Sequence, residues 1–86
     1  MQRYYLDLTN SPSHEDRRGT MFDTLADARL EAVRYAGEIL RSEAETLAQG
    51  HDLRVDVADG RGNILFSVCV QTIHDPARVV TTARAA

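Results

Sequence analysis

Two segments of the chain, residues 53–57 and 64–70, alternate apolar and polar side chains, and the short sequence DGRGN at 59–63 separates them. Alternation with a period of two is typical of strands that bury one face. Asp, Gly and Asn are the residue types that tight hairpin turns favour. The sequence therefore predicts a β-hairpin over residues 53–70, and this one-sided apolar surface must be covered by another element.

A second hairpin is predicted at the start of the chain. Residues 3–8 alternate, residues 9–18 form a polar stretch that contains Pro12, and residues 19–22 are short and β-prone. Clustered polar residues around a proline are typical of a loop. We expect the strand over 3–8 to pair with the strand over 19–22.

Between the two hairpins, apolar residues recur at helical spacing. Thr24 is a suitable N-cap and Gly50 a suitable terminator, so the sequence predicts one helix over about residues 25–48. Gly37 lies in its middle, away from the sheet-facing side, and costs up to about 1 kcal/mol relative to Ala. The face expected to pack on the sheet consists of Leu25, Ala28, Ala32, Tyr35, Ala36, Ile39, Leu40 and Leu47.

These elements predict an α+β fold of two layers, in which one long helix lies on one face of a four-stranded, mainly antiparallel sheet in β-β-α-β-β order. The 86 residues are enough for one domain, which we place at residues 1–74, followed by a flexible C-terminal tail at 75–86. The side chains of the sheet expected to face the helix are Tyr4, Leu6, Leu8, Met21, Leu53, Val55, Val57, Ile64, Phe66, Val68 and Val70.

The predicted helix does not match the predicted sheet in size. Four strands make a sheet about 19 Å wide, of which one helix covers about 10 Å. A helix of some 24 residues is about 36 Å long, whereas the strands reach only about 20–23 Å. Part of the sheet and the end of the helix therefore need a further partner, which is either the tail or a second subunit.

The charge distribution, the length of the apolar runs and the cysteine count limit the classes of protein to which this chain can belong. The net charge of −3 arises in residues 23–50, which hold three Arg and six acidic residues, and the chain contains no Lys. No apolar run approaches the roughly 18 residues of a membrane span, so we expect no membrane contact. Cys69 is the single cysteine and cannot form an internal disulfide, which points to the cytoplasm.

Candidate catalytic and metal-binding residues do not form a recognisable pattern. His14, His51 and His74 each precede an acid, but their spacing is not that of a metal site. Cys69 falls opposite the core on a strand, where a small semi-apolar residue is expected rather than a nucleophile. We therefore expect no metal, no cofactor and no enzymatic activity.

The outer sheet face carries Arg3, Tyr5 and Arg54 together with three carboxylates, Asp7, Asp52 and Asp56. We expect the arginines to form ion pairs with these acids across neighbouring strands. An alternative interpretation is that Arg3, Tyr5 and Arg54 form a weak binding site for nucleic acid or a nucleotide. The three acids on the same face disfavour nucleic acid as a partner.

Five motifs follow one another in a fixed order along the chain: M-x-R-Y-Y-L-D-L at 1–8, Gly19-Thr20, L-x-x-A-R-x-E-A at 25–32, R-V-D-V-x-D-x-x-G at 54–62 and Ile64-Leu65-Phe66. This ordered set resembles a known family of short bacterial proteins, common in alphaproteobacteria, that is classified as a domain of unknown function. The resemblance covers about residues 1–70 and implies a small stand-alone domain, but it supplies no catalytic residues.

The function that these observations favour is a non-enzymatic interaction module. Its partner is either a second copy, which would bind through the uncovered sheet or the helix end, or an unknown protein. Weak binding of nucleic acid or a nucleotide on the open sheet face is the alternative.

Overall fold

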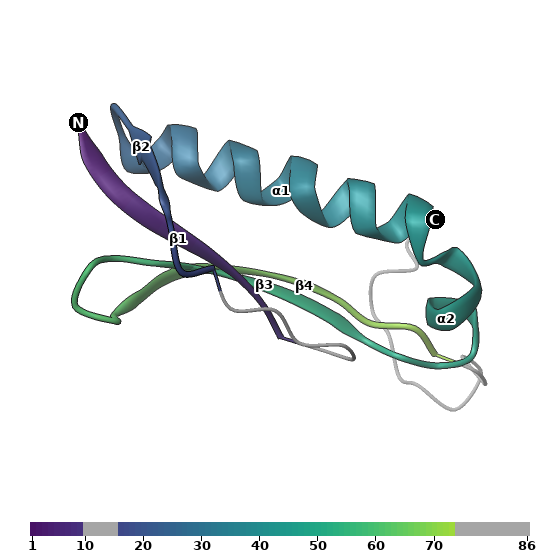
Figure 1. Cartoon of the computed structure of the whole chain (residues 1–86). Coiled ribbons are helices and arrows are strands. Elements are labelled where there is room, and N and C mark those ends of the chain that lie inside the picture. Colours follow the sequence, from purple (N-terminus) through teal and green to yellow (C-terminus); the bar gives the residue numbers. More distant parts are fainter. Residues whose placement is uncertain (10–15, 74–86) are drawn as a thin grey trace, which may run out of the picture.

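The computed structural model describes residues 1–9 and 16–73, and in it a four-stranded antiparallel sheet carries a long helix on one face (Figure 1). The α+β fold and the β-β-α-β-β order are therefore confirmed. Residues 75–86, predicted to be a flexible tail, lie outside the described residues. The elements are β1 (Gln2–Thr9), β2 (Thr20–Phe22), α1 (Leu25–Ser42), α2 (Ala44–Ala48), β3 (Leu53–Ala58) and β4 (Ile64–Val70).

The strands lie in the order β2-β1-β3-β4, so that β1 and β3 are central and β4 is an edge strand. Each hairpin pairs its own two strands, and the β1–β3 ladder joins the hairpins. Leu53, Val55 and Val57 of β3 are the largest fully buried side chains, because β3 has a strand on either side and α1 above it.

The helix approaches the sheet through small side chains, as predicted. Ala28 and Ala32 are 0% exposed and Ala36 is 3% exposed. These three residues follow one another at four-residue intervals, so they form one row along the helix. Thr24 caps α1 as predicted, since its hydroxyl accepts a hydrogen bond of 3.1 Å from the backbone N–H of Asp27.

The prediction of a single helix to residue 48 was wrong. Helix α1 ends at Ser42, Glu43 leaves the helical conformation with φ −111° and ψ 30°, and α2 continues in a new direction (Figure 1). An α1 of 18 residues is about 27 Å long, close to the length of the strands below it. The bend allows Leu47 of α2 to reach the core, where it is only 6% exposed. The helix end that was expected to overhang is thus folded back onto its own chain.

Three residues expected to pack between the helix and the sheet are exposed instead: Met21 by 41%, Ile64 by 54% and Leu40 by 38%. Met21 pairs with Arg3, which is exposed and lies on the face opposite Tyr4, so Phe22 rather than Met21 turns toward the core. Leu40 lies at the margin of the sheet-facing side of α1.

The reversal of Ile64 has a separate cause in the hairpin. Val57 pairs with Phe66 but Ala58 pairs with Ile64, so Leu65 is an extra residue in β4, a β-bulge. The bulge shifts the alternation by one residue and moves Ile64 to the opposite face.

The turn that joins β3 to β4 is held by one carboxylate. Oδ1 of Asp59 accepts hydrogen bonds from the backbone N–H groups of Arg61, at 2.8 Å, and Asn63, at 3.0 Å. Hydrogen bonds from Asn63 are the main reason that the pKa of Asp59 lies below its ordinary value. Gly62 adopts φ 87°, a conformation for which glycine is favoured.

Candidate functional site

The residues proposed for a binding site on the outer face do not form one cluster. Arg3 donates a hydrogen bond of 2.9 Å to the backbone carbonyl of Arg18. Arg54 lies opposite Thr9, and Thr9 is six residues beyond Arg3 on the same strand, a distance of about 20 Å along β1. Tyr5 is half-buried near the Arg3 end. The structure therefore places Arg3 and Tyr5 together and Arg54 apart from them.

The centre of the outer face holds a buried carboxylate. Asp56 is 6% exposed, and its Oδ1 accepts hydrogen bonds from Nε of Arg54, at 2.8 Å, and from Oγ of Ser67, at 2.6 Å. Burial by itself would raise the pKa of Asp56, but the hydrogen bonds from Ser67 and Arg54, the charge of Arg54 and a hydrogen bond from Thr9 outweigh it, so the pKa is lowered. The hydrogen bond to Asp56, followed by its charge, raises the pKa of Arg54.

The expected ion pair across strands is therefore replaced by a pair within one strand. Arg54 and Asp56 are two residues apart on β3 and point to the same side. Ser67, which lies opposite Asp56 on β4, supplies the contact across strands. Because its guanidinium is engaged with Asp56, Arg54 offers less positive charge to an anionic ligand than the sequence suggests.

Asp16 binds the exposed edge of β1 just beyond Thr20, the first residue of β2. Its Oδ2 accepts a hydrogen bond of 3.1 Å from the backbone N–H of Leu6, and its Oδ1 accepts hydrogen bonds from the N–H groups of Arg18 and Gly19. The backbone N–H of Asp16 in turn donates to Oδ1 of Asp7 at 2.8 Å. Both carboxylates thus have a structural role at this edge.

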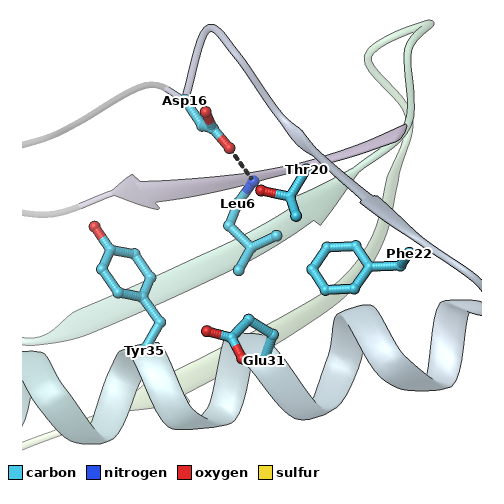
Figure 2. A pocket seen from close by; sticks show the side chains of 6 residues that line it. All are labelled: Leu6, Asp16, Thr20, Phe22, Glu31 and Tyr35. Atoms are coloured by element: carbon cyan, nitrogen blue, oxygen red, sulfur yellow. Dashed lines mark hydrogen bonds between the residues drawn. The ribbon is translucent and has the colours of Figure 1, made fainter. Parts of the chain in front are cut away.

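A groove of about 250 Å³ opens between α1 and the β1–β2 hairpin (Figure 2). Its volume lies just below the range of typical ligand pockets. Glu31 and Tyr35 line it from the helix, with Leu6 and Thr20 opposite them (Figure 2). Its polar groups are two hydroxyls and the carboxylates of Glu31 and Asp16, and the Asp16 carboxylate bonds to backbone N–H groups.

The histidines and the cysteine do not come together in the described part of the chain. His51 is exposed at the start of the segment leading into β3, and Cys69 is exposed on β4 opposite Arg54. His14 and His74 lie outside the described residues. Within residues 1–9 and 16–73, no group of three His, Cys, Asp or Glu side chains could hold a metal ion.

An exposed apolar stripe runs along α1 beside the face that packs on the sheet. Leu30 and Val33 are each 51% exposed. We call this set the apolar stripe: Ala26, Leu30, Val33, Gly37 and Leu40, all of them exposed. The residues recur at intervals of four and three, the spacing of a seam where two helices pack. The sequence analysis missed the stripe because it assigned Leu40 to the core, although the spacing itself was visible.

The stripe lies on the side of α1 that is nearer to β4. The guanidinium of Arg29, which lies next to Leu30 and one turn before Val33, is 5.8 Å from the centre of the Phe66 ring on β4. Glu31 and Tyr35 lie on the other side of the helix, above the groove beside β1.

Strand β4 is the second exposed feature on this side. It has seven residues, Ile64–Val70, with neither charge nor proline. Natural edge strands usually carry such residues because they prevent pairing with another chain. Phe66, Val68 and Val70 turn toward the helix side and are only half-buried, with Arg29 of α1 lying over Phe66.

Comparison with known families identifies the chain. The model of the family described as Domain of unknown function (DUF6894) matches residues 3–71, nearly the whole described region. The chain belongs to this family. The predicted membership of an unknown-function family is therefore confirmed, and the family brings no assigned chemistry. No curated protein and no solved structure matches the chain.

Within residues 1–9 and 16–73, no helix is both long and apolar enough to cross a membrane.

Proposed function

We propose that this domain is a non-enzymatic interaction module that associates with itself. One observation carries the proposal: five of the eight large apolar side chains exposed in the described residues belong to α1 or β4, and the other three are Met1, Met21 and Ile73. Leu30, Val33 and Leu40 belong to α1, and Leu65 and Ile64 belong to β4, with Ile64 turned to the opposite sheet face by the bulge. A row of large exposed apolar side chains on a helix is typical of a protein–protein contact.

The opposite edge of the sheet supports this interpretation by contrast. Strand β2 has only three residues, and beyond its first residue the N–H of Leu6 donates a hydrogen bond to Asp16. Short edge strands and polar side chains on backbone groups are the usual protection against unwanted pairing. The edge at β2 is thus protected, whereas none of residues 1–9 and 16–73 pairs with the outer edge of β4.

Sedimentation equilibrium of the full chain at about 1–200 μM tests self-association. A dimeric mass at the upper end of this range supports the proposal. A dimer with a micromolar Kd has a binding free energy of about −8 kcal/mol. A monomer throughout the range contradicts it. We place the module in the cytoplasm because its sequence has a single cysteine, and fractionation of the host cell checks this assignment.

Weak binding of nucleic acid or a nucleotide through Arg3, Tyr5 and Arg54 stays a prediction. A mobility shift of a single-stranded oligonucleotide at low salt that Tyr5→Ala removes would support it. Because Arg54 is engaged with Asp56 and lies far from Arg3, the structure favours the interaction module.

A further inference from the structure

We infer that the partner is a second copy of this chain, which binds to β4 and to the apolar stripe of α1 at the same time, about one two-fold axis. This inference rests on the proposed function and specifies the surface through which the copies meet. Four features of the described residues support it: the backbone groups of β4, the spacing of the stripe, Gly37 and the charges beside the stripe.

The hydrogen-bond pattern shows which backbone groups of β4 are unpaired in the sheet. Leu6 donates its N–H to Asp16, away from β3, so the pair Leu6–Val57 exchanges no backbone hydrogen bonds. The N–H and C=O of Val57 therefore point to β4 and meet those of Phe66.

Alternation along β4 then turns the backbone N–H and C=O groups of Ser67 and Cys69 outward. The N–H of Thr72 agrees with this alternation, because it points back toward the β3 side and donates to Asp52 at 3.3 Å. The free edge thus offers backbone donors and acceptors at alternate residues, as pairing with a second β4 strand requires.

The apolar stripe complements itself when two α1 helices pack antiparallel. Leu30 then lies opposite Leu40 of the partner subunit, and Val33 opposite Gly37 of the partner subunit. Intervals of four and three keep these residues on one seam. Each large side chain is therefore covered by an apolar residue or fills the space above a glycine.

Gly37 supports this arrangement independently. A glycine in the middle of a helix destabilises it by roughly 0.8–1.0 kcal/mol relative to Ala. Nothing in the described part of the fold requires this glycine, because a Cβ built on Gly37 meets no atom of it within 4 Å and its φ is not positive. Close approach of Val33 from a second helix gives the glycine a reason.

The charges beside the seam favour the antiparallel direction. In that arrangement Asp27 lies near Arg41 of the partner subunit, and Arg29 near Glu43 of the partner subunit, and each pair occurs twice. Arg34 meets its own copy, but Glu31 on the same helix lies 3.9 Å from it and offsets part of that charge. A parallel pair would instead bring Arg29 against Arg34.

A single axis can satisfy both contacts. Helix α1 and strand β4 run in the same general direction (Figure 1). The contact of Arg29 with the Phe66 ring puts the stripe on the β4 side of the helix. A two-fold axis normal to the sheet and beside β4 therefore makes both the strand pair and the helix pair antiparallel. The half-buried side chains between them, Phe66, Val68 and Val70, become the floor of the interface.

The decisive experiment measures the dimer dissociation constant of the full chain and of three variants by sedimentation equilibrium. Leu30→Glu places a charge in the helix seam, and Cys69→Pro removes an outward N–H without breaking the β3 ladder. Met21→Glu is the matched control, because Met21 is also an exposed apolar residue but lies on the far edge. We expect each of the first two variants to raise Kd by about a hundredfold or more and the control to change it less than about threefold.

The outcomes separate this inference from the proposed function. A dimer that survives both Leu30→Glu and Cys69→Pro overturns the inference but leaves self-association intact. Loss of the dimer in only one of them overturns the joint interface. A wild-type chain that is monomeric at every concentration overturns both.

Two further measurements do not depend on the folding of those variants. Hydrogen exchange of the unaltered chain should show protection of the Ser67 and Cys69 amides that increases with protein concentration, and unchanged exchange contradicts strand pairing. Glu43→Arg should raise Kd by about fivefold or more, and Arg29→Glu/Glu43→Arg should restore it to within about threefold. Failure of the double variant to restore binding overturns the antiparallel register.

Discussion

Substitution of Gly19 by alanine tests how tightly the β1–β2 hairpin closes. Gly19 has φ 69°, and an added Cβ would lie 2.8 Å from Cγ of Arg3, 2.8 Å from Cε2 of Tyr5 and 2.9 Å from the carbonyl oxygen of Tyr4. The left-handed conformation costs an L-residue about 1–2 kcal/mol. Overpacking adds about 1–3 kcal/mol, so Gly19→Ala should lower the free energy of unfolding by about 2–5 kcal/mol.

Gly62→Ala is the matched control for this substitution. Gly62 also has a positive φ, 87°, but a Cβ there meets no atom within 4 Å. Only the backbone cost of about 1–2 kcal/mol applies to it. The difference between the two variants therefore isolates the contacts of Arg3, Tyr4 and Tyr5 around Gly19.

Urea unfolding followed by circular dichroism measures both variants, at a protein concentration low enough to keep any dimer dissociated. For a domain whose total stability is about 5–15 kcal/mol, the Gly19 variant loses a large fraction. Combining Gly19→Ala with Arg3→Ala should recover only part of the loss, because the carbonyl of Tyr4 belongs to the backbone and cannot rotate away. Equal losses for Gly19→Ala and Gly62→Ala would refute the reasoning.

Three further predictions concern the core, the outer face and the sheet edge. Ala32→Leu should overpack the layer between α1 and β3 and cost about 1–3 kcal/mol in a urea melt, whereas Arg34→Ala, on the exposed side, should cost less than about 0.5 kcal/mol. Because the pKa of Asp56 is lowered in the folded state, its stabilising contribution is complete above the unfolded-state pKa of about 3.9 and is lost as pH falls through the lower folded-state pKa. Urea melts of Asp56→Asn at a series of pH values should lack this loss of stability in acid. A pH profile of stability identical to that of the unaltered chain would contradict the role assigned to Asp56. Asp16→Ala should leave the N–H of Leu6 without its partner, so hydrogen exchange at Leu6 should accelerate and stability should fall by about 1–3 kcal/mol.

Local patterns were sufficient for the elements and for part of the core. Alternation at 53–57 identified β3, and the row of Ala28, Ala32 and Ala36 identified the face of α1 that approaches it. Thr24 marked the start of the helix because capping involves only residues three apart. These features depend on neighbours in the chain, so the sequence by itself determined them, along with family membership.

The remaining features depend on where strands and helices meet. Two features arise because a hairpin and a helix must fit a sheet of given size. One is the bulge at Leu65, which reverses Ile64, and the other is the bend at Glu43, which allows Leu47 to be buried. The spacing of the apolar stripe of α1 can be read from the sequence, but its exposure depends on which face of the helix packs on β3. Tertiary structure alone decided these points, because burial depends on contacts between segments that are distant in the sequence. The periodicity of one helix does not specify which of its two neighbouring apolar faces those contacts cover.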